Sequence, residues 1–160
     1  MAQKIITNLW FDKEAEEAVA FYTSLFKDSR VLNVARYSEA GPGEPGTVMT
    51  VEFELAGQRF VAINGGPMFP FTEAMSLQVD CEDQDEIDYF WEALTADGGA
   101  ESQCGWCKDR WGMNWQVVPK GMAEFFNGSD PDRVERAVQA MFTMRKIDVA
   151  AMQAAADAAV

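Results

Sequence analysis

Two stretches of the chain, LWFDKEAEEAVAFYTSLF (residues 9–26) and LQVDCEDQDEIDYFWEAL (residues 77–94), follow the same pattern. Each begins with alternating apolar and polar residues, which predicts a strand, and continues with apolar residues at helical spacing. Acidic residues stand at the start of each helical part, where the helix dipole favours negative charge. The two stretches start 68 residues apart, at Leu9 and Leu77, so the sequence indicates an internal repeat.

The segments that follow the two helical stretches also correspond. GQRFVAI (57–63) matches GMNWQVV (112–118), so Phe60 and Trp115 occupy the same place in two final strands. Before these, residues 30–55 predict two strands joined by the turn-rich AGPGEPG, and the shorter 99–112 has room for two brief strands. We therefore predict two modules, 4–64 and 74–119, each made of a strand, a helix and three strands.

The pattern changes after Pro119. Ser129 and Asp130 can cap a helix that begins at Pro131, and the alanine-rich end of the chain is predicted to be helical too. We expect residues 1–120 to form one domain and residues 121–160 to be a helical extension of it. Apolar residues of the extension, such as Ile147 and Met152, are expected to pack on the body or on a second subunit.

Composition narrows the classes of function. The net charge of −13 argues against a nucleic-acid partner, which needs a basic surface. No apolar run is long enough to span a bilayer and no signal peptide opens the chain, so we expect a cytoplasmic protein without a membrane partner. The absence of histidine excludes Ser-His and Cys-His nucleophile pairs and removes the commonest nitrogen ligand for metals.

The paired modules resemble the vicinal oxygen chelate superfamily, which includes glyoxalase I, extradiol dioxygenases and bleomycin-resistance proteins. The segments AINGGP (62–67) and CGWCKDRWGMNWQ (104–116) are similar to its PhnB-like branch, often labelled as demethylubiquinone 3-methyltransferases. The resemblance implies an α+β fold in which two βαβββ modules pair into a curved, half-open barrel around a cavity. It also implies a homodimer.

In metal-dependent members of the superfamily, the first and last strands of each module supply the ligands. Those positions map to Ile6, Val61, Ala74 and Gln116, and only Gln116 carries a donor atom. A divalent cation needs several oxygen or nitrogen ligands. We therefore expect neither a bound metal nor another cofactor.

Strand parity predicts which side chains face the cavity. Leu9 and Phe11 continue the apolar set that faces the helix, so their neighbours face the other way. The expected ligand-binding residues are amide, hydroxyl and indole side chains: Asn8, Trp10, Asn64, Ser76, Gln78, Trp106 and Gln116. Such groups orient a mildly polar small molecule in an apolar pocket. The alternative is that they satisfy one another and a few waters.

The first functional hypothesis is therefore a metal-free small-molecule-binding protein. The alternative is a divalent-metal-dependent lyase, isomerase or dioxygenase of the same superfamily, with catalytic residues that the sequence does not identify. A methyltransferase of the Rossmann type would place a glycine-rich turn between a strand and a helix, whereas strands are predicted on both sides of AGPGEPG.

Cys104 and Cys107 form a C-x-x-C motif, which suggests a third class, a dithiol oxidoreductase. In such enzymes a helix begins at the motif and lowers the pKa of a thiol. Here a strand is predicted after the motif, so we interpret both cysteines as hairpin residues. A labile disulfide between them under oxidising conditions stays open.

Overall fold

The structure, a computed structural model, describes residues 3–158. These residues form two compact units: the first ends at Phe71, and the second begins at Thr72. The second unit contains both the second module and the predicted C-terminal extension. Residues 1–2 of the predicted domain and residues 159–160 of the predicted extension lie outside the described range.

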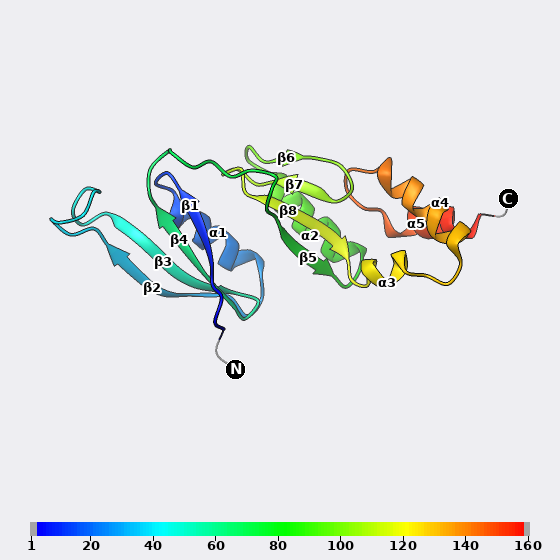
Figure 1. Cartoon of the computed structure of the whole chain (residues 1–160), viewed down its shortest axis with the longest axis horizontal. Helices are drawn as coiled ribbons and strands as arrows, with labels where there is room; N and C mark the ends of the chain where they lie inside the picture. The colour runs from blue at the N-terminus through cyan, green and yellow to red at the C-terminus, as the bar shows by residue number, and fades with distance from the viewer. Residues whose placement is uncertain (1–2, 159–160) are drawn as a thin grey trace. The chain divides into compact units, whose positions relative to one another are not determined.

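The first unit contains one four-stranded sheet and one long helix. Its elements are β1 (Thr7–Phe11), α1 (Ala15–Leu25), β2 (Arg30–Arg36), β3 (Val48–Leu55) and β4 (Gln58–Asn64). The strand order is β1-β4-β3-β2, with β1 parallel to β4 and the other pairs antiparallel. Figure 1 shows α1 along one face of this sheet.

The second unit repeats this topology with shorter strands. Its elements are β5 (Leu77–Cys81), α2 (Gln84–Thr95), β6 (Ala100–Glu101), β7 (Trp106–Lys108) and β8 (Asn114–Pro119). The order is β5-β8-β7-β6, with β5 parallel to β8, and α2 covers one face (Figure 1). The predicted repeat and the glyoxalase-like α+β fold are thereby confirmed.

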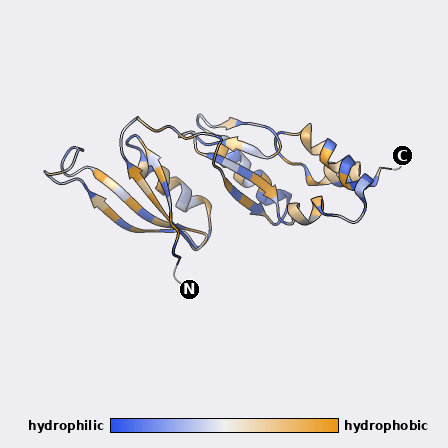
Figure 2. Cartoon of the chain, in the orientation of Figure 1, coloured by the Kyte–Doolittle hydropathy of each residue, from blue (hydrophilic) through white to orange (hydrophobic). Residues whose placement is uncertain are grey.

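Each sheet buries one face under its helix. In β1, Leu9 and Phe11 are buried, whereas Asn8 is exposed and Trp10 is half-buried. The same alternation runs along β3 and appears as the changing colours of the strands in Figure 2. The helix-facing core of the second sheet includes Trp115 and Val117, as parity predicts. We call the opposite face of each sheet its open face.

The pairing register corrects one detail of the predicted repeat. Leu9 lies opposite Ala62, and its counterpart in the second sheet is Val79, which lies opposite Val117. The first strands therefore correspond at a distance of 70 residues, from Leu9 to Val79, and not 68. Because side chains alternate with a period of two, a slip of two residues leaves every predicted face unchanged.

The C-terminal extension consists of α3 (Met122–Phe126), α4 (Pro131–Phe142) and α5 (Val149–Asp157). Asp130 caps α4 by accepting a hydrogen bond from the Arg133 backbone N–H at 3.2 Å, as predicted. Met141, Ile147 and Met152 form a buried cluster, against which Met122, Phe125 and Met144 pack. The methionines of the extension are therefore part of a core.

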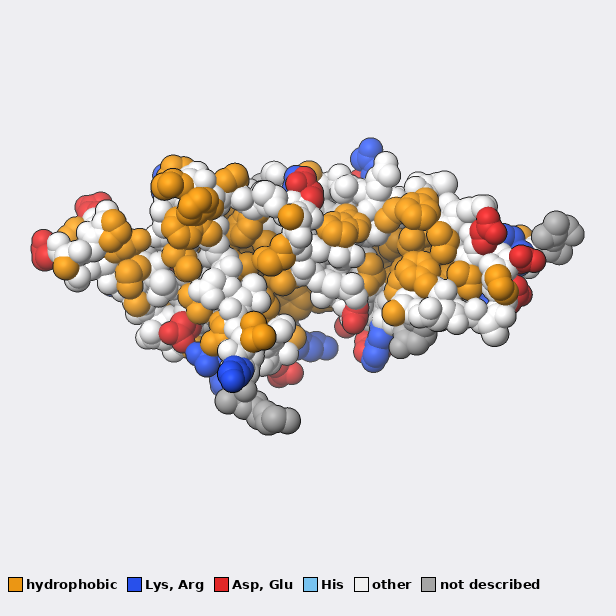
Figure 3. All heavy atoms as spheres, in the orientation of Figure 1, with side chains coloured by type: hydrophobic (Ala, Val, Ile, Leu, Met, Phe, Trp, Pro, Cys, Tyr) orange, Lys and Arg blue, Asp and Glu red, His pale blue; other side chains and the backbone are white. Residues whose placement is uncertain are grey.

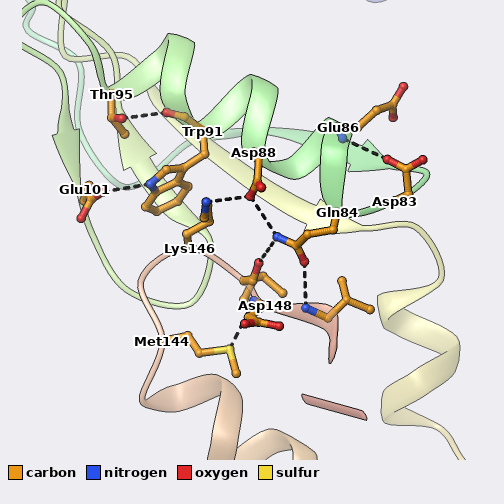
Figure 4. Close-up of polar contacts among 12 residues, drawn as sticks. Asp83, Gln84, Glu86, Asp88, Trp91, Thr95, Glu101, Met144, Lys146 and Asp148 are labelled. Carbon is orange, nitrogen blue, oxygen red and sulfur yellow. Dashed lines mark hydrogen bonds and ion pairs between the residues drawn. The ribbon is translucent and has the colours of Figure 1, made fainter. Parts of the chain in front are cut away.

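Polar contacts tie the extension to α2 (Figure 4). The Gln84 amide donates to the Ile147 carbonyl at 3.0 Å and accepts from the Val149 N–H at 2.9 Å. Lys146 pairs with Asp88 at 2.7 Å, and this contact holds the pKa of the Asp88 carboxyl below its ordinary value. Ile147 is fully buried, so the extension completes the second unit. Within residues 3–158, every helix is too short or too polar to cross a bilayer.

Candidate functional site

The open face of the second sheet carries a row of polar and aromatic side chains across three adjacent strands. Gln78 of β5 lies opposite Gln116 of β8, and Gln116 lies opposite Trp106 of β7. All three share one face because directly paired residues point to the same side of a sheet. We call Gln78, Gln116 and Trp106 the amide row. The structure thus brings together three of the residues that the sequence indicated.

Ser76, a fourth predicted residue, joins this row. Its hydroxyl oxygen accepts a hydrogen bond from the Gln116 amide nitrogen at 2.9 Å, while the Gln78 amide nitrogen donates to Asp80 at 2.7 Å. These bonds orient both amides so that their nitrogens point along the sheet. Within residues 3–158, the two amide oxygens and the Trp106 indole N–H form no hydrogen bond. The row therefore offers two acceptors and one donor to a ligand.

Trp10, on the open face of the first sheet, has a different environment. Its indole N–H donates to the Gly66 carbonyl at 2.8 Å, and its ring makes an edge contact with Phe69 at 5.0 Å between centroids. A Cβ added to Gly65 would lie 2.1 Å from the ring, so this glycine permits the close packing. Asn8 is exposed beside it and donates to the Ile6 carbonyl at 3.1 Å. Trp10 thus anchors the segment that follows β4.

Asn64, also predicted to border the cavity, lies on the helix-facing side of the first sheet. It is paired with Phe11, whose side chain is buried under α1. The Asn64 amide oxygen accepts from the Ala15 N–H, the first of α1, at 2.8 Å, and its nitrogen donates to the Val48 carbonyl at 3.1 Å. Glu14 makes no side-chain cap, so Asn64 satisfies the helix N-terminus from a distant strand.

Asp109 organises the turn before β8, and the sequence analysis did not single it out. Its buried carboxylate accepts from the backbone N–H groups of Trp111 and Met113, both at 3.0 Å, and from the Trp115 indole N–H at 2.9 Å. This arrangement places Trp115 in the core and therefore Gln116 on the open face. In the sequence Asp109 stands between Lys108 and Arg110, as an exposed turn acid would, so no local signal identified it.

The C-x-x-C motif lies in a hairpin, as predicted. Cys104 and Gly105 both have positive φ, of 55° and 81°, and the Trp106 N–H donates to the Gln103 carbonyl at 3.0 Å. These angles fit the two central residues of a tight turn within the loop 102–105 that joins β6 to β7. Burial, followed by the nearby Asp109 and Glu101 carboxylates, raises the pKa of the Cys107 thiol to about 12. The thiolate needed for disulfide exchange is therefore disfavoured.

The side chains at the four expected metal positions do not form a suitable donor set. With the corrected register, Ile6 corresponds to Ser76 instead of Ala74. The four positions are then occupied by two aliphatic residues, Ile6 and Val61, and by two neutral polar residues, Ser76 and Gln116. The side chains of Ser76 and Gln116 are hydrogen-bonded to each other. Hard divalent cations select several oxygen ligands, including charged ones. In the described part of the chain, no three His, Cys, Asp or Glu side chains are grouped to hold a metal.

The chain is similar to a known protein family and to a solved structure. The sequence profile described as 3-demethylubiquinone-9 3-methyltransferase matches residues 3–118, more than half of the chain. A solved PhnB protein from Bacillus cereus, also named as such a methyltransferase, is 42% identical, with a TM-score of 0.66, and the match covers 72% of this chain and 99% of that one. No curated protein matches the chain.

Two more distant structures share the fold alone. One is a protein from Pseudomonas aeruginosa, 17% identical, with a TM-score of 0.60 over 74% of this chain and 99% of that one. The other is the fosfomycin resistance protein FosX from Listeria monocytogenes in complex with Mn(II) and sulfate. It is 14% identical, with a TM-score of 0.53 over 79% of this chain and 97% of that one.

Proposed function

Because this chain belongs to the 3-demethylubiquinone-9 3-methyltransferase family, within the vicinal oxygen chelate superfamily, we propose that it binds a small organic molecule. We place the binding surface on the open face of the second sheet. The observation that carries this proposal is the amide row, in which two oriented glutamines and one tryptophan lie side by side on three strands. Ser76 extends the row, and Asn8 lies on the corresponding face of the first sheet.

The row favours a neutral ligand with a flat apolar part and one or two hydrogen-bond donors. The free amide oxygens of Gln78 and Gln116 would accept from hydroxyl or N–H groups, and the Trp106 indole N–H would donate to a carbonyl. The indole ring of Trp106 is half-buried and would stack on the flat part of the ligand. Apolar side chains are exposed in several places on the face of the chain shown in Figure 3.

We further propose that the site works without a resident cation, because the residues at the four metal positions supply only a hydroxyl and a carboxamide. Elemental analysis of protein purified without chelators tests this. We expect less than about one metal in ten chains. Stoichiometric Ni, Zn, Mn or Fe would contradict the proposal and favour the metal-dependent lyase, isomerase or dioxygenase.

We do not propose methyltransferase activity for this chain, although the family's name contains it. A Rossmann-type cofactor site lies at the carboxyl ends of parallel strands, where a glycine-rich turn leads into a helix. Here the glycine-rich residues 40–46 join the antiparallel strands β2 and β3. This loop therefore lacks the strand, turn and helix order of a Rossmann-type cofactor site.

We also propose a homodimer in the cytoplasm. Several large apolar side chains are exposed on the chain, among them Met68 at 73% and Phe142 at 63%, and association would cover such surface. Light scattering after size exclusion at micromolar concentration should give twice the chain mass. A single-chain mass under the same conditions would contradict the proposed dimer.

A thermal-shift screen of a metabolite library tests the binding site. Compounds that stabilise the wild type should lose most of their effect in Gln116→Ala, because ligand stabilisation follows affinity. The matched control is Gln139→Ala, an exposed glutamine on α4, which should keep every shift. Equal shifts for all compounds in wild type and Gln116→Ala would rule out the amide row as the site.

A further inference from the structure

The first unit contains a pocket that lies outside the proposed site. Its volume is about 700 Å³, within the range of small-molecule sites. It is bounded by residues around the start of α1, by the loop between β2 and β3 with the strand ends beside it, and by the residues at the end of β4 and just after it. Of the seven predicted site residues, only Asn64 lines it.

The wall formed by the β2–β3 loop is held in place by Tyr37. The Tyr37 hydroxyl donates to the Asn64 carbonyl at 2.6 Å, and its backbone N–H and carbonyl bond to Thr47 and Gly46, each at 2.9 Å. A Cβ on Gly43 would lie 2.4 Å from the Tyr37 ring, so the loop folds tightly against the ring. Glycine at this position lets the backbone approach the ring, and the pocket is therefore preformed.

The basic residues of this pocket differ from most others in the protein. Within residues 3–158, eight of the thirteen lysines and arginines form ion pairs with carboxylates. Lys13 and Arg36 form none within residues 3–158, yet both line the pocket. Arg36 donates one hydrogen bond, to the Gly46 carbonyl at 3.0 Å, which leaves most of its five donors available.

Three acidic side chains, Asp12, Glu16 and Glu44, line the same pocket, and within the described range they too form no ion pair. The pocket is therefore lined by positive and negative side chains that form no ion pairs with one another. A simple anion would be attracted by two groups and repelled by three, and a simple cation would meet the reverse. A ligand that carries both charges would be attracted by both sets.

We infer that this pocket binds a small zwitterion of the α-amino acid class, with its carboxylate held by Lys13 and Arg36 and its ammonium group by the acidic residues. Arg36 provides a planar fork that matches a carboxylate, and Lys13 adds a point charge. The Tyr37 ring and Pro42 supply an apolar surface for the side chain of the ligand. This site is separate from the amide row and does not depend on the proposed function.

Amide chemical-shift mapping of the ¹⁵N-labelled protein tests the inference, with the standard α-amino acids as probes at up to about 10 mM. At least one amino acid should shift the amides of residues 12–16, 36–47 and 64–66 in a saturable way. Its N-acetyl and carboxamide derivatives each lack one charge and should bind at least about fivefold more weakly.

Lys13→Gln and Arg36→Gln should each weaken binding about fivefold or more. The control Lys27→Gln should not, because Lys27 lies outside the pocket; like Lys13, it has no ion pair within residues 3–158. Gln116→Ala should leave these shifts unchanged, which separates this site from the proposed one. The inference fails if no amino acid perturbs the three segments. It also fails if the singly charged derivatives bind as well as the parent, or if Lys13→Gln and Lys27→Gln behave alike.

Discussion

Replacing Asp109 by asparagine should destabilise the second unit far more than the similar size of the two side chains suggests. The Asp109 side chain is 2% exposed, and its carboxylate accepts hydrogen bonds from the backbone N–H groups of Trp111 and Met113 and from the indole N–H of Trp115. Asparagine keeps one carbonyl oxygen, which can still serve the two backbone donors. Its NH₂ group would then face the Trp115 indole N–H, so a donor would meet a donor.

The expected loss of stability follows from the hydrogen bond that the Trp115 indole N–H would lose. A hydrogen bond to a charged acceptor contributes about 1.5–3 kcal/mol, and a buried donor that loses its acceptor keeps its desolvation cost. Trp115 is 2% exposed, so water cannot replace the carboxylate. We therefore expect Asp109→Asn to lower the free energy of unfolding by about 2–4 kcal/mol. Binding at Gln116 should weaken as well, because this residue directly follows Trp115 in β8.

Urea denaturation followed by tryptophan fluorescence measures this loss. Asp97→Asn is the matched control, since Asp97 is 70% exposed and pairs with Arg110 at 2.9 Å. Exposed ion pairs contribute little, so the control should change stability by less than about 1 kcal/mol. If Asp109→Asn costs no more than Asp97→Asn, Asp109 does not organise the turn and the reasoning is wrong.

Four further predictions concern single residues. Asn64→Ala removes the acceptor of the first backbone N–H of α1 and should cost about 1–2 kcal/mol in urea denaturation, while a cost below about 0.5 kcal/mol would argue against the tertiary cap. Iodoacetamide near about pH 8 should modify Cys104 before Cys107, as followed by peptide mass spectrometry, and equal rates would contradict the burial of Cys107. Because the fold raises the pKa of Cys107 to about 12, this thiol stabilises the fold below its unfolded pKa of about 8.5, and that contribution should be lost as pH rises toward 12. Gly65→Ala should displace the Trp10 ring, lower stability by about 1–3 kcal/mol and red-shift the fluorescence, and an unchanged spectrum would refute the contact.

Period-two alternation explains why much of the fold could be predicted from the sequence. The predicted helix-facing side of Leu9 and Phe11 is correct although the repeat is aligned two residues out of register. Parity is insensitive to such a slip, because a shift of two residues returns each side chain to the same face. The same property brought Gln78 and Gln116 together, and it indicates that Asn64, two residues after the buried Ala62, faces α1.

Contacts between distant parts of the chain could not be predicted in the same way. The bond from the Ala15 N–H to Asn64 spans 49 positions, and the bonds of Gln84 to the extension span 63 and 65. No local pattern encodes these partners, since an amide side chain fits many environments. The role of Asp109 is local, but a buried acid and a solvated turn acid look alike in a single sequence.

The most direct test is to map a bound hit from the thermal-shift screen by NMR on protein treated with a chelator. The side-chain amides of Gln78 and Gln116 and the Trp106 indole N–H should shift together and saturate with a single dissociation constant. Shifts confined to other surfaces, or binding that returns only when a divalent metal is added, would contradict a metal-free ligand site on the amide row.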